Sequence, residues 1–156
     1  MAELPYVRAK LLPEQRDNAD SSCRSLCFFL EFADGTIINV LDYEDIVTEE
    51  MYKKPDVKEI ALLILFPEVT CWPEKRYGVE RSDRKDVFYG KLKERDEEGE
   101  SMTVDIGQGS IYLCPVRDWK HYDELWRLKT GCFIKVESKN TYLCDIKGYP
   151  HRQHVY

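Results

Sequence analysis

The sequence lacks the long apolar segment that a membrane-spanning helix requires. Hydrophobic residues make up 43% of its 156 residues, but no uninterrupted apolar run approaches the roughly 18 residues that cross a bilayer. No basic and then apolar leader opens the chain. We therefore expect an unsecreted, cytoplasmic protein without membrane contact, which folds as one composite domain around a hydrophobic core.

No recognisable catalytic constellation appears in the sequence. The chain has three histidines, and no cysteine lies in a recognisable arrangement with a base. Gly107-Gln108-Gly109 is not followed by the Lys-Ser or Lys-Thr pair of a phosphate-binding loop. The sequence therefore predicts a protein that is not an enzyme and uses no cofactor. A residual nuclease or thiol enzyme stays as an alternative that offers no good candidate residue.

The six cysteines are expected to be reduced and mostly buried, because the chain is long enough to form a core without disulfide bridges. A zinc site would need Cys23 and Cys27 together with His151 and His154. The spacing of both pairs is poor for zinc. We expect no bound metal.

Charge is distributed unevenly along the chain. The net charge is −6, and the first 70 residues hold 14 acidic against 7 basic side chains, whereas residues 74–95 are rich in lysine and arginine. An acidic protein is a poor general binder of nucleic acid, because that affinity depends on neutralising phosphates. We interpret the basic stretch as a solvated face. Single-stranded RNA binding along residues 75–95 remains an alternative.

The first half of the sequence predicts a strand over residues 6–12 and a hairpin over residues 27–46. The hairpin turns at Asp34-Gly35, and its second strand is β-branched. One or two helical turns are expected within residues 42–54. The apolar run 59–66 predicts a buried strand, with a buried helix as the alternative. Residues 83–95 predict an amphipathic helix through Val87, Phe88 and Leu92.

The second half predicts two further hairpins and one helix. The hairpins pair residues 102–106 with 110–116, and residues 133–137 with 141–146. The helix runs from a cap at Asp118 through residue 128, with Gly131 after its end. Trp119, Tyr122 and Trp126 share one face, which indicates packing; base stacking is the alternative. The predicted fold class is mainly β with two or three short helices.

Four runs resemble the strands of a Tudor barrel: Tyr6-Val7-Arg8-Ala9-Lys10, residues 27–34, residues 37–40, and Asp45-Ile46. The rest is similar to the flank of an extended Tudor domain, in which a staphylococcal-nuclease-like OB fold without catalytic power packs on the barrel. The resemblance implies a Tudor-like barrel in residues 1–50 and an OB-like flank in residues 51–156. It does not identify the strand that precedes Tyr6 in the family. Either another chain or residues 133–146 would supply this strand, or the barrel is incomplete.

In that family an aromatic cage binds methylated arginine through the faces of its rings. The resemblance places Phe29 and Phe32 at two cage positions. Val7, next to Tyr6, falls where a tyrosine is usual, and Asp34 replaces the asparagine that orients the guanidinium. The implied cage is therefore degenerate.

The resemblance implies a scaffold for protein–protein interaction in ribonucleoprotein granules, germ granules and small-RNA pathways. Its partner would be a disordered, arginine-bearing protein segment that docks in the cleft between barrel and flank. The alternatives are a single-stranded RNA-binding module of OB type and a reader of arginine or methyl-arginine peptides that depends on the cage.

Overall fold

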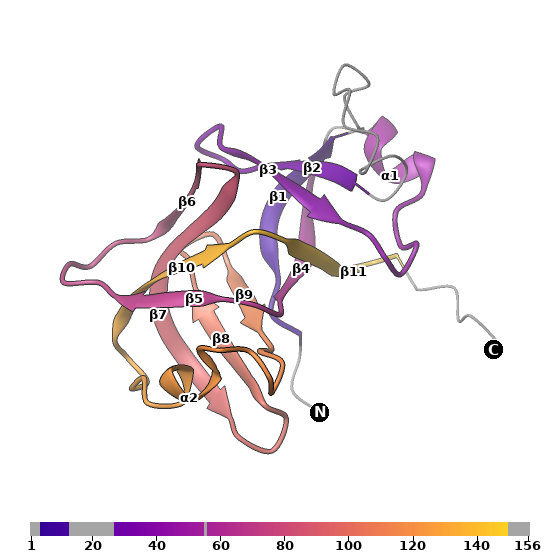
Figure 1. Cartoon of the computed structure of the whole chain (residues 1–156). Helices are drawn as coiled ribbons and strands as arrows, with labels where there is room; N and C mark the ends of the chain where they lie inside the picture. Colours follow the sequence, from indigo (N-terminus) through magenta and orange to yellow (C-terminus); the bar gives the residue numbers. More distant parts are fainter. Residues whose placement is uncertain (1–3, 13–26, 55, 150–156) are drawn as a thin grey trace, which may run out of the picture.

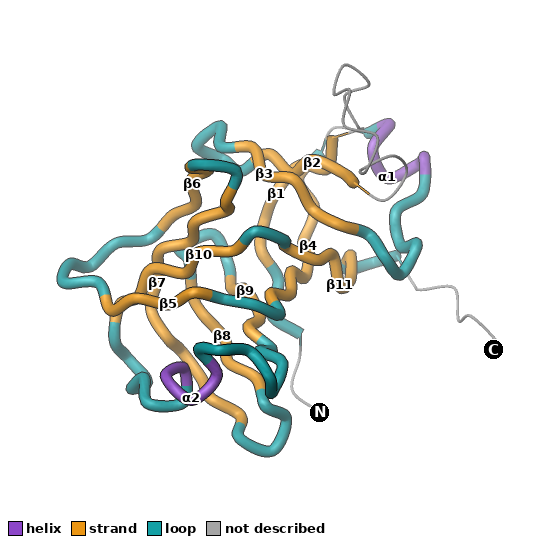
Figure 2. The backbone as a smooth tube through the Cα atoms, in the orientation of Figure 1, coloured by secondary structure: helices purple, strands orange, loops and turns teal. Residues whose placement is uncertain are grey.

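The protein is mainly β in the computed structural model, which describes residues 4–12, 27–54 and 56–149. Figures 1 and 2 show the strands and two short helices within these residues. The strands are β1 (Val7–Leu12), β2 (Cys27–Glu31), β3 (Ile37–Leu41), β4 (Val57–Ile64), β5 (Glu68–Cys71), β6 (Gly78–Ser82), β7 (Lys85–Asp96), β8 (Ser101–Asp105), β9 (Ser110–Leu113), β10 (Phe133–Ser138) and β11 (Thr141–Ile146), and the helices are α1 (Glu49–Lys53) and α2 (Tyr122–Leu125). The predicted β-rich class is confirmed.

Five strands form a closed path of pairing, here called the first strand circuit. β1 pairs with β2 and β2 with β3, both antiparallel; β3 then pairs in parallel with β11. β11 pairs with β4, and β4 returns to β1. The strands of the N-terminal hairpin are thus completed by β4 and β11 of the same chain, on the right of Figure 1. Strand pairing therefore crosses residue 50, the expected boundary between barrel and flank.

The remaining strands form a second strand circuit, which begins at β4 and ends at β5, the next strand along the chain. β4 pairs in parallel with β9, and antiparallel pairing continues from β9 through β8, β7 and β10 to β5. β5 follows β4 in the chain, and β6 adds to the edge of β7. β4 therefore belongs to both circuits, which fixes them against one another.

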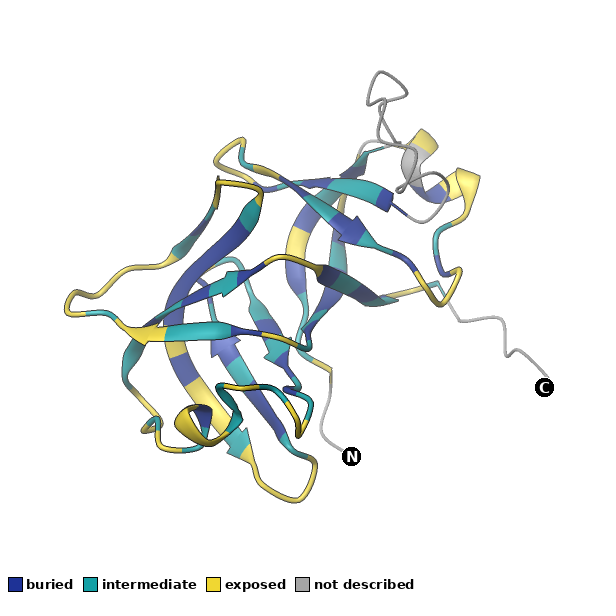
Figure 3. Ribbon diagram, viewed as in Figure 1, coloured by how far each residue is buried: buried dark blue, intermediate teal, exposed yellow. Residues whose placement is uncertain are grey.

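The buried side chains explain why β4 is the shared strand. Ile60, Ala61, Leu62 and Ile64 are at most 1% exposed, as expected for a strand covered on both faces. β1, covered on one face, instead alternates buried and more exposed positions. Figure 3 shows the buried positions running along the strands of both circuits. One continuous cluster of buried side chains joins the two circuits.

The predicted amphipathic helix over residues 83–95 is wrong, because this segment forms β7. Positions 86 to 90 are all buried, a continuous run that suits a strand paired on both edges. Asp83 and Arg84 have φ values of 50° and 64° and form the tight turn between β6 and β7. Two successive positive φ values are typical of a two-residue hairpin turn.

Two further expectations need correction. The helix predicted from Asp118 through residue 128 is reduced to the four residues of α2, and Trp119 lies outside it. Residues 133–137 and 141–146 do form strands, but they do not form a hairpin within the described chain: β10 pairs with β5 and β7, whereas β11 pairs with β3 and β4. The hairpins β2–β3 and β8–β9 and the strand at residues 59–66 are confirmed.

The turn after β3 depends on a buried carboxylate. Asp42 is 2% exposed, and its two oxygens accept hydrogen bonds from the backbone N–H groups of Ile46 (2.9 Å) and Val47 (2.8 Å). Asp42→Ala should lower the free energy of unfolding by about 2 kcal/mol, because both N–H groups lose their partner. Chemical denaturation would measure this loss. Asp42→Asn retains one acceptor oxygen and should lose less; equal losses would contradict the role of the paired oxygens.

Candidate functional site

Two of the expected cage residues lie in the core. Val7 is fully buried and Phe32 is 2% exposed, and both belong to the continuous hydrophobic cluster. Phe29 is half-buried on β2, opposite Asn39 of β3. No ring contact among the described residues includes Phe29 or Phe32. Val7 and Phe32 therefore contribute to packing of the core.

The other two expected residues are separate from them. The Tyr6 hydroxyl donates a hydrogen bond of 2.5 Å to Asp145. Asp34 is exposed, and its carboxylate accepts the backbone N–H of Thr36 at 2.9 Å within the β2–β3 turn. Tyr6 and Phe32 line two different hollows of the described surface. The structure thus does not gather the five residues Tyr6, Val7, Phe29, Phe32 and Asp34 around one pocket.

A different pair of aromatic rings meets on the first strand circuit. The ring centroids of Tyr43 and Tyr142 are 5.5 Å apart, with 31° between the ring planes. They border a pocket of about 400 Å³, here called the tyrosine pocket. Its walls are otherwise mostly aliphatic, and its full lining is Tyr43, Glu44, Leu63, Leu65, Tyr142, Leu143 and Cys144.

The strand register brings the two tyrosines together. Tyr142 of β11 lies opposite Leu41 of β3 on one side and Leu63 of β4 on the other. Tyr43 follows the end of β3, and the buried Asp42 carboxylate anchors the turn after it. Tyr43 remains 63% exposed, so its ring is available to a ligand.

Two carboxylates act on the thiol that lines the tyrosine pocket. Burial is the main cause that raises the pKa of the Cys144 thiol, and the carboxylates of Asp145 and Glu44 raise it further. Burial also raises the pKa of Tyr142, with a smaller contribution from Tyr43. Two ring faces, aliphatic walls and nearby carboxylates together suit a cation carried on an apolar stem.

Sequence reasoning missed this site. Asp42, Glu44 and Asp45 make the turn after β3 acidic, yet Asp42 is buried. The only local signal was a tyrosine inside that acidic turn. Its partner, Tyr142, is distant in the sequence, and the parallel pairing of β3 with β11 that joins them has no local sequence pattern.

A second, larger hollow lies where the two circuits face one another. Its volume is about 680 Å³, and its walls come from β1, the β2–β3 turn and the β8–β9 turn. Arg8 and Lys10 contribute positive charge and Glu31 negative charge. The Gln108 side chain accepts the backbone N–H of Ala33 at 3.1 Å across it. This hollow lies between the two circuits, and its charges are mixed.

Several thiols have environments that oppose thiolate formation. The pKa of Cys114 is raised to about 11, mainly by burial and to a smaller extent by Cys144. Burial is also the main cause that raises the pKa of Cys132. A nucleophilic cysteine requires the opposite shift.

The chain matches no known family model, no curated protein and no solved structure. Within the described ranges, neither helix has the length and apolar character to cross a membrane. The same residues contain no group of three or more His, Cys, Asp or Glu side chains arranged to hold a metal ion. Cys23, His151 and His154 of the zinc alternative lie outside the described residues.

Proposed function

We propose that the chain is a non-enzymatic protein-interaction module that binds an arginine-bearing segment of a partner protein in the tyrosine pocket. The observation that carries the proposal is the contact between Tyr43 and Tyr142 beside Glu44, in a pocket with aliphatic walls. A disordered segment suits an open surface site of this kind, because it can extend along the strands that flank the pocket.

The guanidinium of arginine matches this pocket chemically. Its flat face stacks on a tyrosine ring, which contributes about 0.5–1 kcal/mol at an exposed site and more when the cation is desolvated. Its N–H groups can donate hydrogen bonds to the Glu44 carboxylate. Its methylene stem would contact Leu63 and Leu65.

The proposal retains the extended Tudor resemblance as its structural interpretation. The closed five-strand pairing of the first circuit supports a Tudor-like barrel, and the adjoining second circuit supports an OB-like flank. On this interpretation the protein is a cytoplasmic scaffold of ribonucleoprotein granules in a small-RNA pathway. The family's methyl-arginine cage is then degenerate at Val7 and Asp34, and the tyrosine pocket binds the arginine instead.

Replacing Tyr43 tests the proposal directly. Because Tyr43 is 63% exposed, Tyr43→Ala should leave the fold intact and weaken binding of an arginine–glycine peptide by about 2- to 5-fold, the equivalent of roughly 0.5–1 kcal/mol. Isothermal titration calorimetry of both proteins would measure the change. Peptides with unmethylated and symmetrically dimethylated arginine would establish which form binds tighter.

Tyr77→Ala provides the matched control, because Tyr77 is another exposed tyrosine, 39% exposed, which packs against Phe133 of the second circuit. Its affinity for the peptide should equal that of the unmodified protein. Equal affinities of the unmodified protein and Tyr43→Ala would refute the tyrosine pocket as the binding site.

A further inference from the structure

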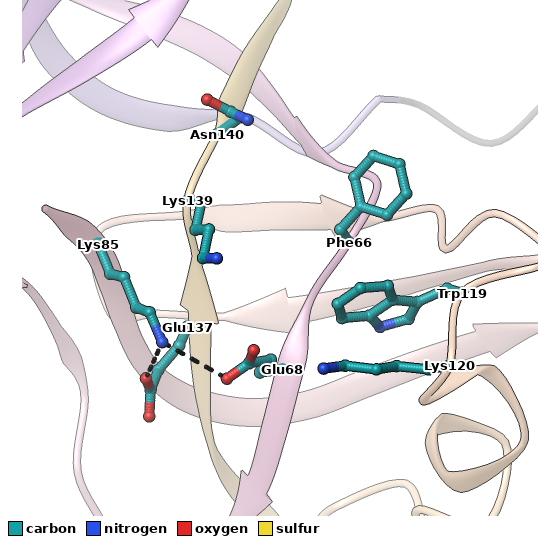
Figure 4. Close-up of a pocket in the computed structure, with 8 residues that line it drawn as sticks. All are labelled: Phe66, Glu68, Lys85, Trp119, Lys120, Glu137, Lys139 and Asn140. Carbon is teal, nitrogen blue, oxygen red and sulfur yellow. Dashed lines mark ion pairs between the residues drawn. The ribbon is translucent and has the colours of Figure 1, made fainter.

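A second pocket, independent of the tyrosine pocket, combines an aromatic wall with lysines. Phe66 is 44% exposed, and its ring meets the ring of Trp119 edge to face, with centroids 5.4 Å apart and 72° between the planes. The Trp119 Nε1–H donates a hydrogen bond of 2.9 Å to the carbonyl of Pro67. That bond holds the indole in place, so Phe66 and Trp119 form a fixed wall on one side of the pocket (Figure 4).

The carboxylates of this pocket are already paired with lysines. Lys85 lies 3.6 Å from Glu68 and 3.5 Å from Glu137, and Lys135 lies 3.4 Å from the other oxygen of Glu137. Figure 4 shows the two ion pairs of Lys85 as dashed lines at the lower left. These ion pairs offset part of the negative charge of the two glutamates.

Lys120 and Lys139 supply the positive charge that remains. Both line the pocket, and neither has a carboxylate within ion-pair distance among the described residues. Lys120 Nζ lies 5.7 Å from the centroid of the Trp119 ring. An anion near the aromatic wall would thus meet two lysines without displacing an existing ion pair.

The opposite side of the pocket comes from the segment that passes between the two circuits. β10 ends at Ser138 and β11 begins at Thr141, and these strands pair with different neighbours. Lys139 and Asn140 between them therefore face Phe66 and Trp119 across the pocket in Figure 4. The Asn140 side-chain amide provides donors and an acceptor, which can pair with the edge of a nucleobase.

We propose that this aromatic–lysine pocket binds a nucleotide, either as a small molecule or as one unit of a single strand. The base would stack on Phe66 beside Trp119, and its phosphate would contact Lys120 and Lys139. The pocket volume of about 230 Å³ is below the roughly 300–1,000 Å³ of drug-sized sites, so it suits one planar group. An acidic peptide would satisfy the lysines but has no use for the exposed aromatic wall, whereas a nucleotide uses both.

Fluorescence anisotropy with a labelled ten-nucleotide single strand tests the proposal, with unlabelled adenosine monophosphate and a glutamate-rich peptide as competitors. We expect saturable binding at low salt with a log–log salt slope of about −0.7, because the two lysines neutralise one phosphate of the single strand. Phe66→Ala should weaken binding by at least about 5-fold, because stacking of one base carries that much affinity. If adenosine monophosphate displaces the labelled oligonucleotide, the pocket binds a mononucleotide. If it does not, the pocket requires a nucleotide that is part of a single strand of nucleic acid.

Further variants separate this pocket from other basic surfaces and from misfolding. Lys120→Glu with Lys139→Glu changes two exposed side chains and should abolish binding with the fold intact, while Lys91→Glu in the basic stretch and Tyr43→Ala in the tyrosine pocket should have no effect. The proposal is overturned if the labelled oligonucleotide does not bind at low salt, or if Phe66→Ala binds it as well as the unmodified protein does. It is also overturned if Lys91→Glu abolishes binding. A third contradicting result would be that the glutamate-rich peptide displaces the oligonucleotide while adenosine monophosphate does not bind.

Discussion

Gly109→Ala is expected to lower the free energy of unfolding by about 3 kcal/mol, the combined cost of overpacking and of a strained φ. Gly109 has a φ of +118°, and a Cβ atom there would lie 2.1 Å from the carbonyl oxygen of Tyr6 and 2.8 Å from the Cα of Val7. Both contacts are with backbone, which cannot move aside as a flexible side chain could. The substitution should therefore force β1 away from the β8–β9 turn.

This contact also joins the two strand circuits. The N–H of Ser110 donates to the carbonyl of Tyr6 at 3.0 Å, and the N–H of Arg8 donates to the carbonyl of Gln108 at 2.9 Å. Displacement of β1 would break both hydrogen bonds. We therefore expect the loss from Gly109→Ala to appear as a lower midpoint of cooperative unfolding in urea.

Gly35→Ala is the matched control. Gly35 has a φ of +89°, but a Cβ atom there would meet no atom within 4 Å. Its replacement should cost only the conformational strain, about 1–2 kcal/mol. The difference in the free energy of unfolding between the two variants gives the cost of the steric overlap between the Cβ atom at position 109 and the backbone of β1. If Gly109→Ala costs no more than Gly35→Ala, the backbone contact does not stabilise the fold.

Asp86→Asn is expected to remove a pH dependence of stability. Asp86 is 4% exposed, and burial raises its pKa from 3.8 to about 6, although a hydrogen bond from Thr141 and the charge of Arg81 act in the opposite direction. Between these two pKa values the folded protein binds more protons at this site than the unfolded chain. Its stability should therefore fall as the pH rises from about 4 to about 6, by about 3 kcal/mol in total.

Asparagine has nearly the same shape as aspartate and stays neutral. Its side-chain oxygen can accept the Thr141 hydroxyl, which donates to Asp86 at 2.7 Å. At pH 7.5 the Asp86→Asn variant should thus be more stable than the unmodified protein, and at pH 4 the two should be close. Urea denaturation of both proteins at a series of pH values would give the difference in their free energies of unfolding as a function of pH. A difference that does not change with pH would contradict the raised pKa.

The parts of the fold that could be predicted from the sequence are those with local signals. Asp34-Gly35 and the glycines around Gln108 identify the β2–β3 and β8–β9 hairpins, because these residues accept positive φ. The run that forms β4 could be recognised as buried from its composition alone. β7 could not, because its turn carries Asp83 and Arg84 at positive φ, and its consecutive buried residues also fit one face of a helix.

Closure of the circuits could not be predicted, because it depends on two parallel pairings between distant strands. β3 with β11 and β4 with β9 have no connecting turn that would specify their register. The tyrosine pocket could not be predicted from the sequence for the same reason. The resemblance identified Phe29 and Phe32 from their position in a single strand, whereas Tyr43 and Tyr142 meet only because β3 and β11 pair.

The most direct test of the proposed function is a titration of isotopically labelled protein with arginine–glycine peptides, unmethylated and symmetrically dimethylated, followed by NMR. Binding in the tyrosine pocket predicts saturable shifts of the Tyr43 and Tyr142 ring signals and of the Cys144 amide, with little change at Phe29. Shifts centred on Phe29 and Asp34 instead, or no shifts with either peptide at millimolar concentration, would contradict it.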